Sequence, residues 1–171
     1  MAVEASQRAA VAYLCLGSNM GDKVAYLTAA RQAIGELPGT RVTGESSLYH
    51  TAPVGKTDQD WFLNQVLRVE TRLAPRELLR SCLAIETKLG RVRLERWGPR
   101  VIDIDLLVYD DVTSDDEELT LPHPRMAERA FVLVPLAELD PELRVGGRSV
   151  AELLAALPET ELHGVVRCEP A

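Results

Sequence analysis

The sequence has few features of a membrane-bound, secreted or nucleic-acid-binding protein. It contains no run of about 20 apolar residues, the length that a membrane-spanning helix requires. Its first residues show no charged segment followed by an apolar one, so we expect no secretory signal. The net charge of −7 and the pI of about 5.0 argue against a broad basic surface for nucleic acid or an anionic membrane.

Cysteines are few, and the common phosphate-binding loops are missing. Cys15, Cys82 and Cys168 are far apart and odd in number, which fits neither a disulfide framework nor a metal site. We therefore expect reduced thiols and a cytoplasmic protein. Neither G-x-x-x-x-G-K-[ST] nor G-x-G-x-x-G occurs. A phosphate site in this chain would have to be built from side chains and metal ions.

The length and composition are those of one globular domain. The chain has 171 residues, of which 46% are apolar and 26% charged. No linker marks a second domain, so residues 1–171 are predicted to form a single one. We also expect a monomer.

Hydrophobic periodicity predicts alternating strands and helices. Strands are expected at 11–16, 41–50, 61–71 and 102–108, and helices from Asp22 to Pro38, from Pro75 to Gly90 and near 150–157. The order βαββαβ is the ferredoxin-like pattern of an α+β fold, in which an antiparallel sheet carries both helices on one face. The other face is then free to build a site, and the rest of the chain forms C-terminal additions.

The last strand of this core, in RWGPRVIDIDLLVYD, carries two carboxylates. Side chains alternate along a strand, so four apolar residues are predicted to share the core face: Ile102, Ile104, Leu106 and Val108. Asp103 and Asp105 then lie side by side on the other face. Their charges repel unless water, a basic partner or a metal ion lies between them. A solvated strand face is the simplest interpretation of this pair alone.

Basic residues around the aspartates favour a second interpretation. They are Arg91, Arg93, Arg96 and Arg100 on one side and His123, Arg125 and Arg129 on the other. Arginine binds phosphate oxygens through paired donors, and Mg²⁺ prefers one or two carboxylates together with phosphate oxygens. The pattern fits a site for a metal-bound polyphosphate. It fits equally a set of surface salt bridges, each of which contributes little to stability.

The strand WFLNQVLRVET places Phe62, Asn64 and Val66 on one face. An aromatic ring beside a carboxamide can bind a flat heterocycle, because Phe62 can stack and Asn64 offers both donors and acceptors. A core position for Phe62 and an edge position for Asn64 would explain the same pattern. On these residues alone both interpretations stay open.

Several separated segments resemble the 6-hydroxymethyl-7,8-dihydropterin pyrophosphokinases. The most specific segment is RWGPRVIDIDLL, and it occurs in order with YLCLGSNMGD, YHTAPVG, DQDWFLNQV, ELL…IETKLGRVR and LPHPRMAERAFVLVPLAEL. The resemblance covers residues 11–143. It implies transfer of pyrophosphate from ATP to the hydroxymethyl group of 6-hydroxymethyl-7,8-dihydropterin, which leaves AMP, as a step of folate biosynthesis.

The resemblance also implies roles for individual residues. Asp103 and Asp105 would hold two Mg²⁺ ions and form the catalytic set together with Arg91 and Arg100. The implied ATP-binding residues are Glu86, Arg91, Arg100, Thr120, His123 and Arg129. The implied pterin-binding residues are Thr51, Ala52, Pro53, Val54, Phe62, Asn64 and Phe131, with Trp97 in a lid. Compared with the family pattern, Ala52, Glu118 and Pro124 are departures, and the acidic stretch 110–118 is predicted to be a solvated loop.

Two other functions are compatible with the fold pattern. An RNA-binding module would stack bases on aromatic rings of the sheet, but the acidic charge, the 5% aromatic content and the missing RNP-type run argue against it. A regulatory domain that binds a small molecule without catalysis would leave the paired aspartates and the arginines unexplained. We therefore predict a Mg²⁺-dependent enzyme that binds ATP and a pterin, and neither nucleic acid nor membrane.

Overall fold

The computed structural model describes residues 9–51, 61–90 and 101–168. The first seven elements are β1 (Ala10–Ser18), α2 (Lys23–Gly35), β2 (Thr40–Glu45), β3 (Tyr49–Thr51), β4 (Phe62–Thr71), α3 (Pro75–Lys88) and β5 (Asp103–Tyr109). They are followed by β6 (Ser114–Asp115), β7 (Thr120–Leu121), a 3₁₀ turn (Met126–Glu128), α4 (Ala130–Leu139), β8 (Arg144–Val145), β9 (Arg148–Ser149), α5 (Val150–Ala155), α6 (Glu159–Leu162) and β10 (Val165–Arg167). None of the helices in these three ranges has the length and apolar content of a membrane span.

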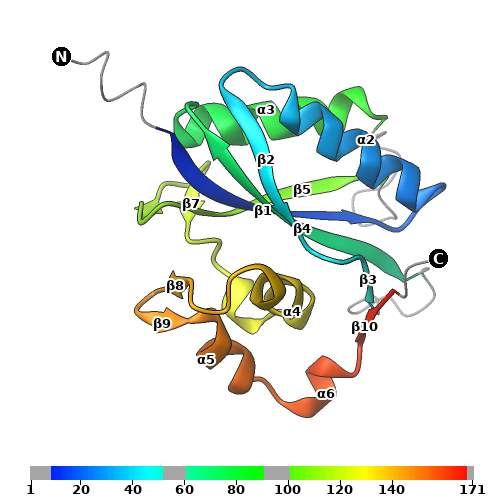
Figure 1. Ribbon diagram of the computed structural model, residues 1–171, viewed down its shortest axis with the longest axis vertical. Coiled ribbons are helices and arrows are strands. Elements are labelled where there is room, and N and C mark those ends of the chain that lie inside the picture. The colour runs from blue at the N-terminus through cyan, green and yellow to red at the C-terminus, as the bar shows by residue number, and fades with distance from the viewer. Residues whose placement is uncertain (1–8, 52–60, 91–100, 169–171) are drawn as a thin grey trace.

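Six strands form one antiparallel sheet in the order β10-β3-β4-β1-β5, and β2 pairs with β4 on the same side as β3. Helices α2 and α3 lie together on one face of this sheet (Figure 1). This arrangement confirms the predicted ferredoxin-like α+β fold.

Both helices begin as the sequence predicts. The Asp22 carboxylate accepts a hydrogen bond from the Ala25 amide (3.1 Å) and caps α2. Pro75 opens α3, where its missing N–H would have no intrahelical partner in any case. The buried side chains that pack against the sheet are Leu27, Ala30 and Ile34 from α2 and Leu78, Cys82 and Ile85 from α3. Val24, near the start of α2, is 54% exposed and takes no part in this packing.

The predicted strand 41–50 is divided into β2 and β3 at Ser46. The Ser46 amide donates to the Val66 carbonyl, and the Ser46 hydroxyl accepts from the Val66 amide, both at 2.9 Å. A side chain that bonds to the neighbouring backbone interrupts the regular ladder. The prediction of one continuous strand is therefore wrong.

A bulge in β5 changes the face of one predicted core residue. Leu14 on β1 lies opposite Leu106, but the preceding Tyr13 lies opposite Val108, which leaves Leu107 as an extra residue on β5. Val108 consequently packs on the face opposite to Leu106. The prediction that Val108 shares the core face of Ile102, Ile104 and Leu106 is wrong.

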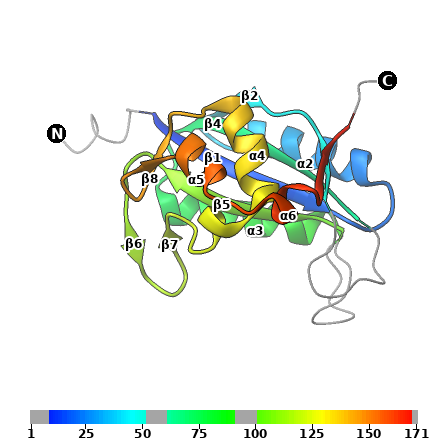
Figure 2. The same cartoon turned by 90° about the horizontal axis from the view of Figure 1, so that it is seen from below.

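The second face of the sheet is only partly free. Helix α4 lies across it, on the side opposite to α2 and α3 (Figures 1 and 2). A second apolar core fills the space between α4 and the sheet. It includes Tyr13, Val66 and Val108 from the sheet and Leu133 and Leu136 from α4. The expectation of a wholly free face is thus corrected, and a site must use the part that α4 leaves uncovered.

Candidate functional site

The expected pterin and metal residues lie in register across this second face. Asn64 on β4 pairs with Gly17 on β1, and Gly17 pairs with Asp103 on β5. Asp105 follows on the same face of β5, opposite Cys15. Because neighbouring strands lie about 4.8 Å apart, the backbones at Asn64 and Asp103 are separated by about 10 Å. The carboxamide and the two carboxylates therefore belong to one surface.

Gly17 makes room for the Asn64 side chain. A Cβ atom added at Gly17 would lie 2.6 Å from Asn64 Nδ2, closer than carbon and nitrogen atoms approach without displacement. The predicted strand 11–16 ended before this residue, so sequence analysis missed its role. A glycine inside a strand is a signal of close approach by another group, and β1 does continue to Ser18.

Asn64 is buried and its orientation is fixed. Its Oδ1 accepts a hydrogen bond from the Thr51 hydroxyl (2.5 Å), and its Nδ2 donates to the Leu16 carbonyl (3.3 Å). These two bonds leave further donor and acceptor capacity on the carboxamide. Phe62 lies on the same face of β4 and is half-buried, directly opposite Thr51. The structure thus brings together Thr51, Phe62 and Asn64, three of the expected pterin-binding residues.

Phe131 and Arg129 meet at the start of α4. The Arg129 guanidinium carbon lies 5.4 Å from the centroid of the Phe131 ring, within the range of a cation–π contact. The resemblance assigned Phe131 to the pterin and Arg129 to the nucleotide. Their contact means that the two expected subsites adjoin each other at this point.

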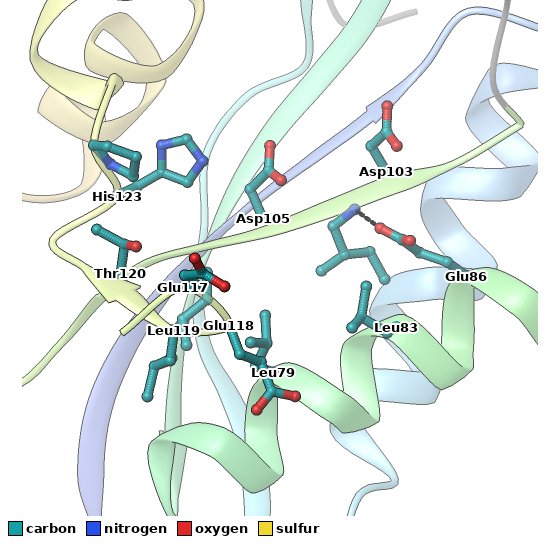
Figure 3. A pocket seen from close by; sticks show the side chains of 13 residues that line it. Leu79, Leu83, Glu86, Asp103, Asp105, Glu117, Glu118, Leu119, Thr120 and His123 are labelled. Carbon is teal, nitrogen blue, oxygen red and sulfur yellow. Dashed lines mark hydrogen bonds between the residues drawn. The ribbon is translucent and has the colours of Figure 1, made fainter. Parts of the chain in front are cut away.

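A cavity of about 340 Å³ lies beside β5, between α3 and the β6–β7 hairpin (Figure 3). The expected functional residues in its lining are Glu86, Asp103, Asp105, Thr120 and His123. Leu79, Leu83 and Leu119 supply apolar wall. The lining mixes these apolar side chains with polar ones, among them the carboxylates of Glu117 and Glu118, and the volume suits a small ligand.

Glu86 links α3 to the strand that carries the aspartates. The side chain is 3% exposed, and its Oε2 accepts a hydrogen bond from the Ile104 amide (2.6 Å), drawn in Figure 3. This bond satisfies an outward-facing amide on the edge strand. Glu86 therefore holds β5 in place, and its contact with ATP stays a prediction.

His123 lies at the other end of the cavity. Its backbone amide donates to the Leu107 carbonyl (2.8 Å), and its Nδ1 accepts from the Arg125 amide (3.4 Å). Burial lowers the pKa of the imidazole, with help from the cationic Arg129 and Arg125 and against the effect of Asp105. A neutral imidazole with an accepting Nδ1 carries its proton on Nε2, so His123 can donate a hydrogen bond without a net charge.

The donor atoms at Asp103 and Asp105 fit a shared Mg²⁺ site. Within the described ranges, no three or more His, Cys, Asp or Glu side chains are grouped closely enough to hold a metal ion by themselves. Mg²⁺ usually keeps several waters and binds one or two carboxylates plus substrate phosphates. The two aspartates therefore fit an ion held between protein and polyphosphate. Burial and the charge of Asp105 raise the pKa of the nearby Cys15 thiol, and Mg²⁺ prefers oxygen ligands to sulfur, so Cys15 is not an expected ligand.

The β6–β7 hairpin is attached to α3 by ion pairs. Arg80 donates to both carboxylate oxygens of Glu118 (2.9 and 3.1 Å), and Arg76 contacts Glu118 and Asp116. The Thr120 hydroxyl donates to the Asp116 carbonyl (3.1 Å). The predicted solvated loop at 110–118 is exposed at every position except Ser114, but its C-terminal end is also held by ion pairs that the prediction did not include. Sequence analysis missed this because Arg80 lies 38 residues before Glu118.

We expect the double substitution Arg76→Gln and Arg80→Gln to weaken ATP binding roughly 2- to 5-fold, the scale of exposed ion pairs. It would leave Glu118, which lines the cavity, without its cationic partners, so that its charge repels phosphate, and it would release the hairpin. Calorimetry at low and high salt measures this, and the difference from wild type should shrink as salt increases. Arg144→Gln, which removes an exposed ion pair with Glu152 elsewhere, is the control. Equal ATP affinity in the double variant would contradict the role of these arginines.

Six expected site residues lie outside the described residues: Ala52, Pro53, Val54, Arg91, Trp97 and Arg100. Their roles stay predictions.

Comparisons with known proteins assign the chain to a family. Residues 13–141 match the family model described as 7,8-dihydro-6-hydroxymethylpterin-pyrophosphokinase. The chain is 54% identical over 154 residues to a 2-amino-4-hydroxy-6-hydroxymethyldihydropteridine pyrophosphokinase of Methylorubrum extorquens, covering 90% of this chain and 98% of that one. Identity to the Pseudomonas aeruginosa protein of the same name is 46% over 147 residues, covering 85% and 91%.

A solved structure with the same fold is that of wild-type Plasmodium falciparum HPPK-DHPS with pterin and p-hydroxybenzoate. The TM-score is 0.66 at 16% identity, and the match covers 86% of this chain but 43% of that longer one. This likeness shows the shared fold, and the sequence matches establish that the chain belongs to the 7,8-dihydro-6-hydroxymethylpterin-pyrophosphokinase family.

Proposed function

We propose that the chain transfers pyrophosphate from ATP to the hydroxymethyl group of 6-hydroxymethyl-7,8-dihydropterin in a Mg²⁺-dependent reaction, which yields AMP and the pterin diphosphate. That it is a pyrophosphokinase of folate biosynthesis follows from its family. One observation carries the assignment of the site: a fixed carboxamide and a pair of carboxylates share one sheet face across Gly17.

The pterin half is built around Asn64 and Phe62. The carboxamide can exchange hydrogen bonds with the pyrimidine edge of the pterin, and the Phe62 ring can contact its flat face. A two-ring heterocycle lying along the row from Asn64 to Asp103 directs its hydroxymethyl substituent towards the carboxylates. The positions of Asn64 and Asp103 on the two strands that flank β1 therefore determine where the attacking oxygen lies and which way it points.

The nucleotide half is built around the cavity beside β5. Leu79, Leu83 and Leu119 offer apolar surface to the base of ATP, while Asp103 and Asp105 would hold Mg²⁺ beside the phosphates. Bound Mg²⁺ would neutralise phosphate charge. His123 can donate from Nε2, and Arg129 adds a cation, so both can stabilise charge on the phosphate oxygens.

The reaction requires alignment more than covalent participation by the protein. The hydroxymethyl oxygen gives up its proton to solvent and bonds to the β-phosphorus, while the bond from that phosphorus to the α–β bridging oxygen breaks. Charge then develops on the oxygen that leaves with AMP. Donors that already point at the phosphates stabilise this charge without reorganising.

Product analysis with γ-labelled ATP tests the proposal. We expect AMP in an amount equal to the labelled pterin diphosphate, and no products when the pterin is omitted or Mg²⁺ is chelated. The site geometry by itself allows attack on either the β- or the γ-phosphorus, so this measurement decides which bond breaks. ADP together with a pterin monophosphate would identify an ordinary kinase and refute the proposed reaction.

A further inference from the structure

The end of the chain returns to the sheet beside the pterin half of the site. Strand β10 pairs antiparallel with β3, with Val165 opposite Thr51 and Arg167 opposite Tyr49. The pairing continues one residue further, where the Cys168 amide donates to the Leu48 carbonyl (2.8 Å). Figure 1 shows β10 next to β3 at the edge of the sheet. This strand lies beyond residues 13–141, so the family match gives it no role.

Apart from β10, strand β3 has few backbone contacts that stabilise it in the sheet. It is three residues long, and on its other side it pairs only with the first residues of β4, from Phe62 to Asn64. A short strand with one neighbour is prone to local opening. The second neighbour, β10, covers its outer backbone edge and makes β3 an interior strand.

A side-chain cluster attaches β3 to helix α4. Glu138 on α4 accepts hydrogen bonds from the Tyr49 hydroxyl (2.7 Å) and from the Ser47 hydroxyl (2.8 Å). Burial alone would raise the pKa of Glu138, but these bonds, with the charge of Arg167 on β10, lower it overall. The ionised carboxylate therefore connects α4 to the chain at β3, and Arg167 adds an attractive charge from β10.

The last residue of β3 connects this pairing to the pterin site. Thr51 lies opposite Val165 and also donates the hydrogen bond that fixes the Asn64 carboxamide. We infer that β10 is a positioning element of the pterin half of the site, because it holds β3, and with it Thr51, where Thr51 orients Asn64. The inference rests on the proposed function. ATP binding should not depend on β10, since the nucleotide cavity lies at β5, the opposite edge of the sheet.

Val166→Pro tests the inference, because it disrupts the pairing of β10 with β3 without changing a buried side chain. Hydrogen-bonded pairs alternate along an antiparallel ladder, so the bond from Cys168 to Leu48 makes Val166 and His50 a hydrogen-bonded pair. Proline at position 166 has no N–H to donate. The Val166 side chain is 49% exposed, so little packing is lost. Val166→Thr is the matched control, since it keeps the N–H and the branched shape.

We expect Val166→Pro to raise the Kd of the dihydropterin about 5- to 10-fold, the effect of one poorly oriented hydrogen bond. The Kd of ATP with Mg²⁺ should stay at the wild-type value, and KM for the pterin should rise with kcat nearly unchanged. Hydrogen exchange at His50 and Thr51 should become faster. Val166→Thr should match wild type in every measurement.

Unchanged pterin affinity despite faster exchange in β3 would overturn the inference, and so would an equal loss of pterin and ATP affinity. Should Val166→Pro fail to fold, Arg167→Gln decides instead. It removes only the charge beside Glu138, and a pterin-selective weakening supports the role of β10 whereas wild-type affinity for both ligands refutes it. Absence of pterin binding by the wild-type protein would refute the proposed function and leave β10 without a site to position.

Discussion

Replacing Asp103 or Asp105 by alanine should reduce turnover by about 1,000-fold or more, the scale of several kcal/mol of lost charge stabilisation. Both side chains lie on the uncovered part of the sheet face and are only half-buried. Their carboxylates are the expected Mg²⁺ ligands between protein and phosphates. Without either one, the phosphates lose both their placement and the neutralisation of their charge.

The fold should survive these substitutions, because alanine at a half-buried strand position leaves no large cavity. Rates of AMP formation measure the effect on activity, and thermal melts without metal measure the effect on stability. Asp111→Ala, an exposed acidic residue just after β5, is the control and should keep wild-type activity. A wild-type rate in Asp103→Ala or Asp105→Ala would disprove their role as metal ligands.

Gly17→Ala should raise the Kd of the dihydropterin roughly 10- to 100-fold, the range of one or more lost hydrogen bonds to a buried ligand. The added Cβ would lie 2.6 Å from Asn64 Nδ2, and the carboxamide is already held by Thr51 and Leu16. Asn64 must therefore move out of the orientation that we propose binds the pterin. Calorimetry should show nearly unchanged ATP affinity.

Two further variants identify the cause of this effect. Gly35→Ala adds a methyl group with an ordinary 3.8 Å contact in α2, and it should leave both affinities unchanged. Asn64→Ala should weaken pterin binding by itself, and adding Gly17→Ala should then cost little more, because the two changes act through one side chain. Additive losses would show that the new methyl group blocks the pterin directly. Wild-type pterin affinity in Gly17→Ala would contradict the proposed site.

Most of the fold could be predicted from local sequence patterns. The helices begin where Asp22 and Pro75 indicate, because caps and first-turn preferences act over a few residues. Two of the errors in the strands have non-local or irregular causes. Ser46 ends β2 by bonding to Val66 on another strand, and the bulge at Leu107 depends on pairing with β1.

In the site, too, local patterns were predictable from the sequence and contacts between distant segments were not. The period of two placed Asp103 with Asp105 and Phe62 with Asn64, and the structure confirms that each pair shares a face. The closeness of Gly17 to Asn64 depends on the register between β1 and β4, which one strand alone does not reveal. The ion pairs of Glu118 with α3 likewise depend on how distant segments pack.

The bulge at Leu107 is a position where β5 can lose a residue during evolution without a change of register. It separates the pairing of Asp105 with Cys15 from the pairing of Tyr109 with Ala12. Elsewhere in a regular ladder, gaining or losing one residue turns every later side chain to the opposite face. Loss of the bulged residue would instead join two stretches that already pair correctly with β1. Loss of one residue at this position is therefore compatible with keeping Asp103 and Asp105 on the same face of the sheet.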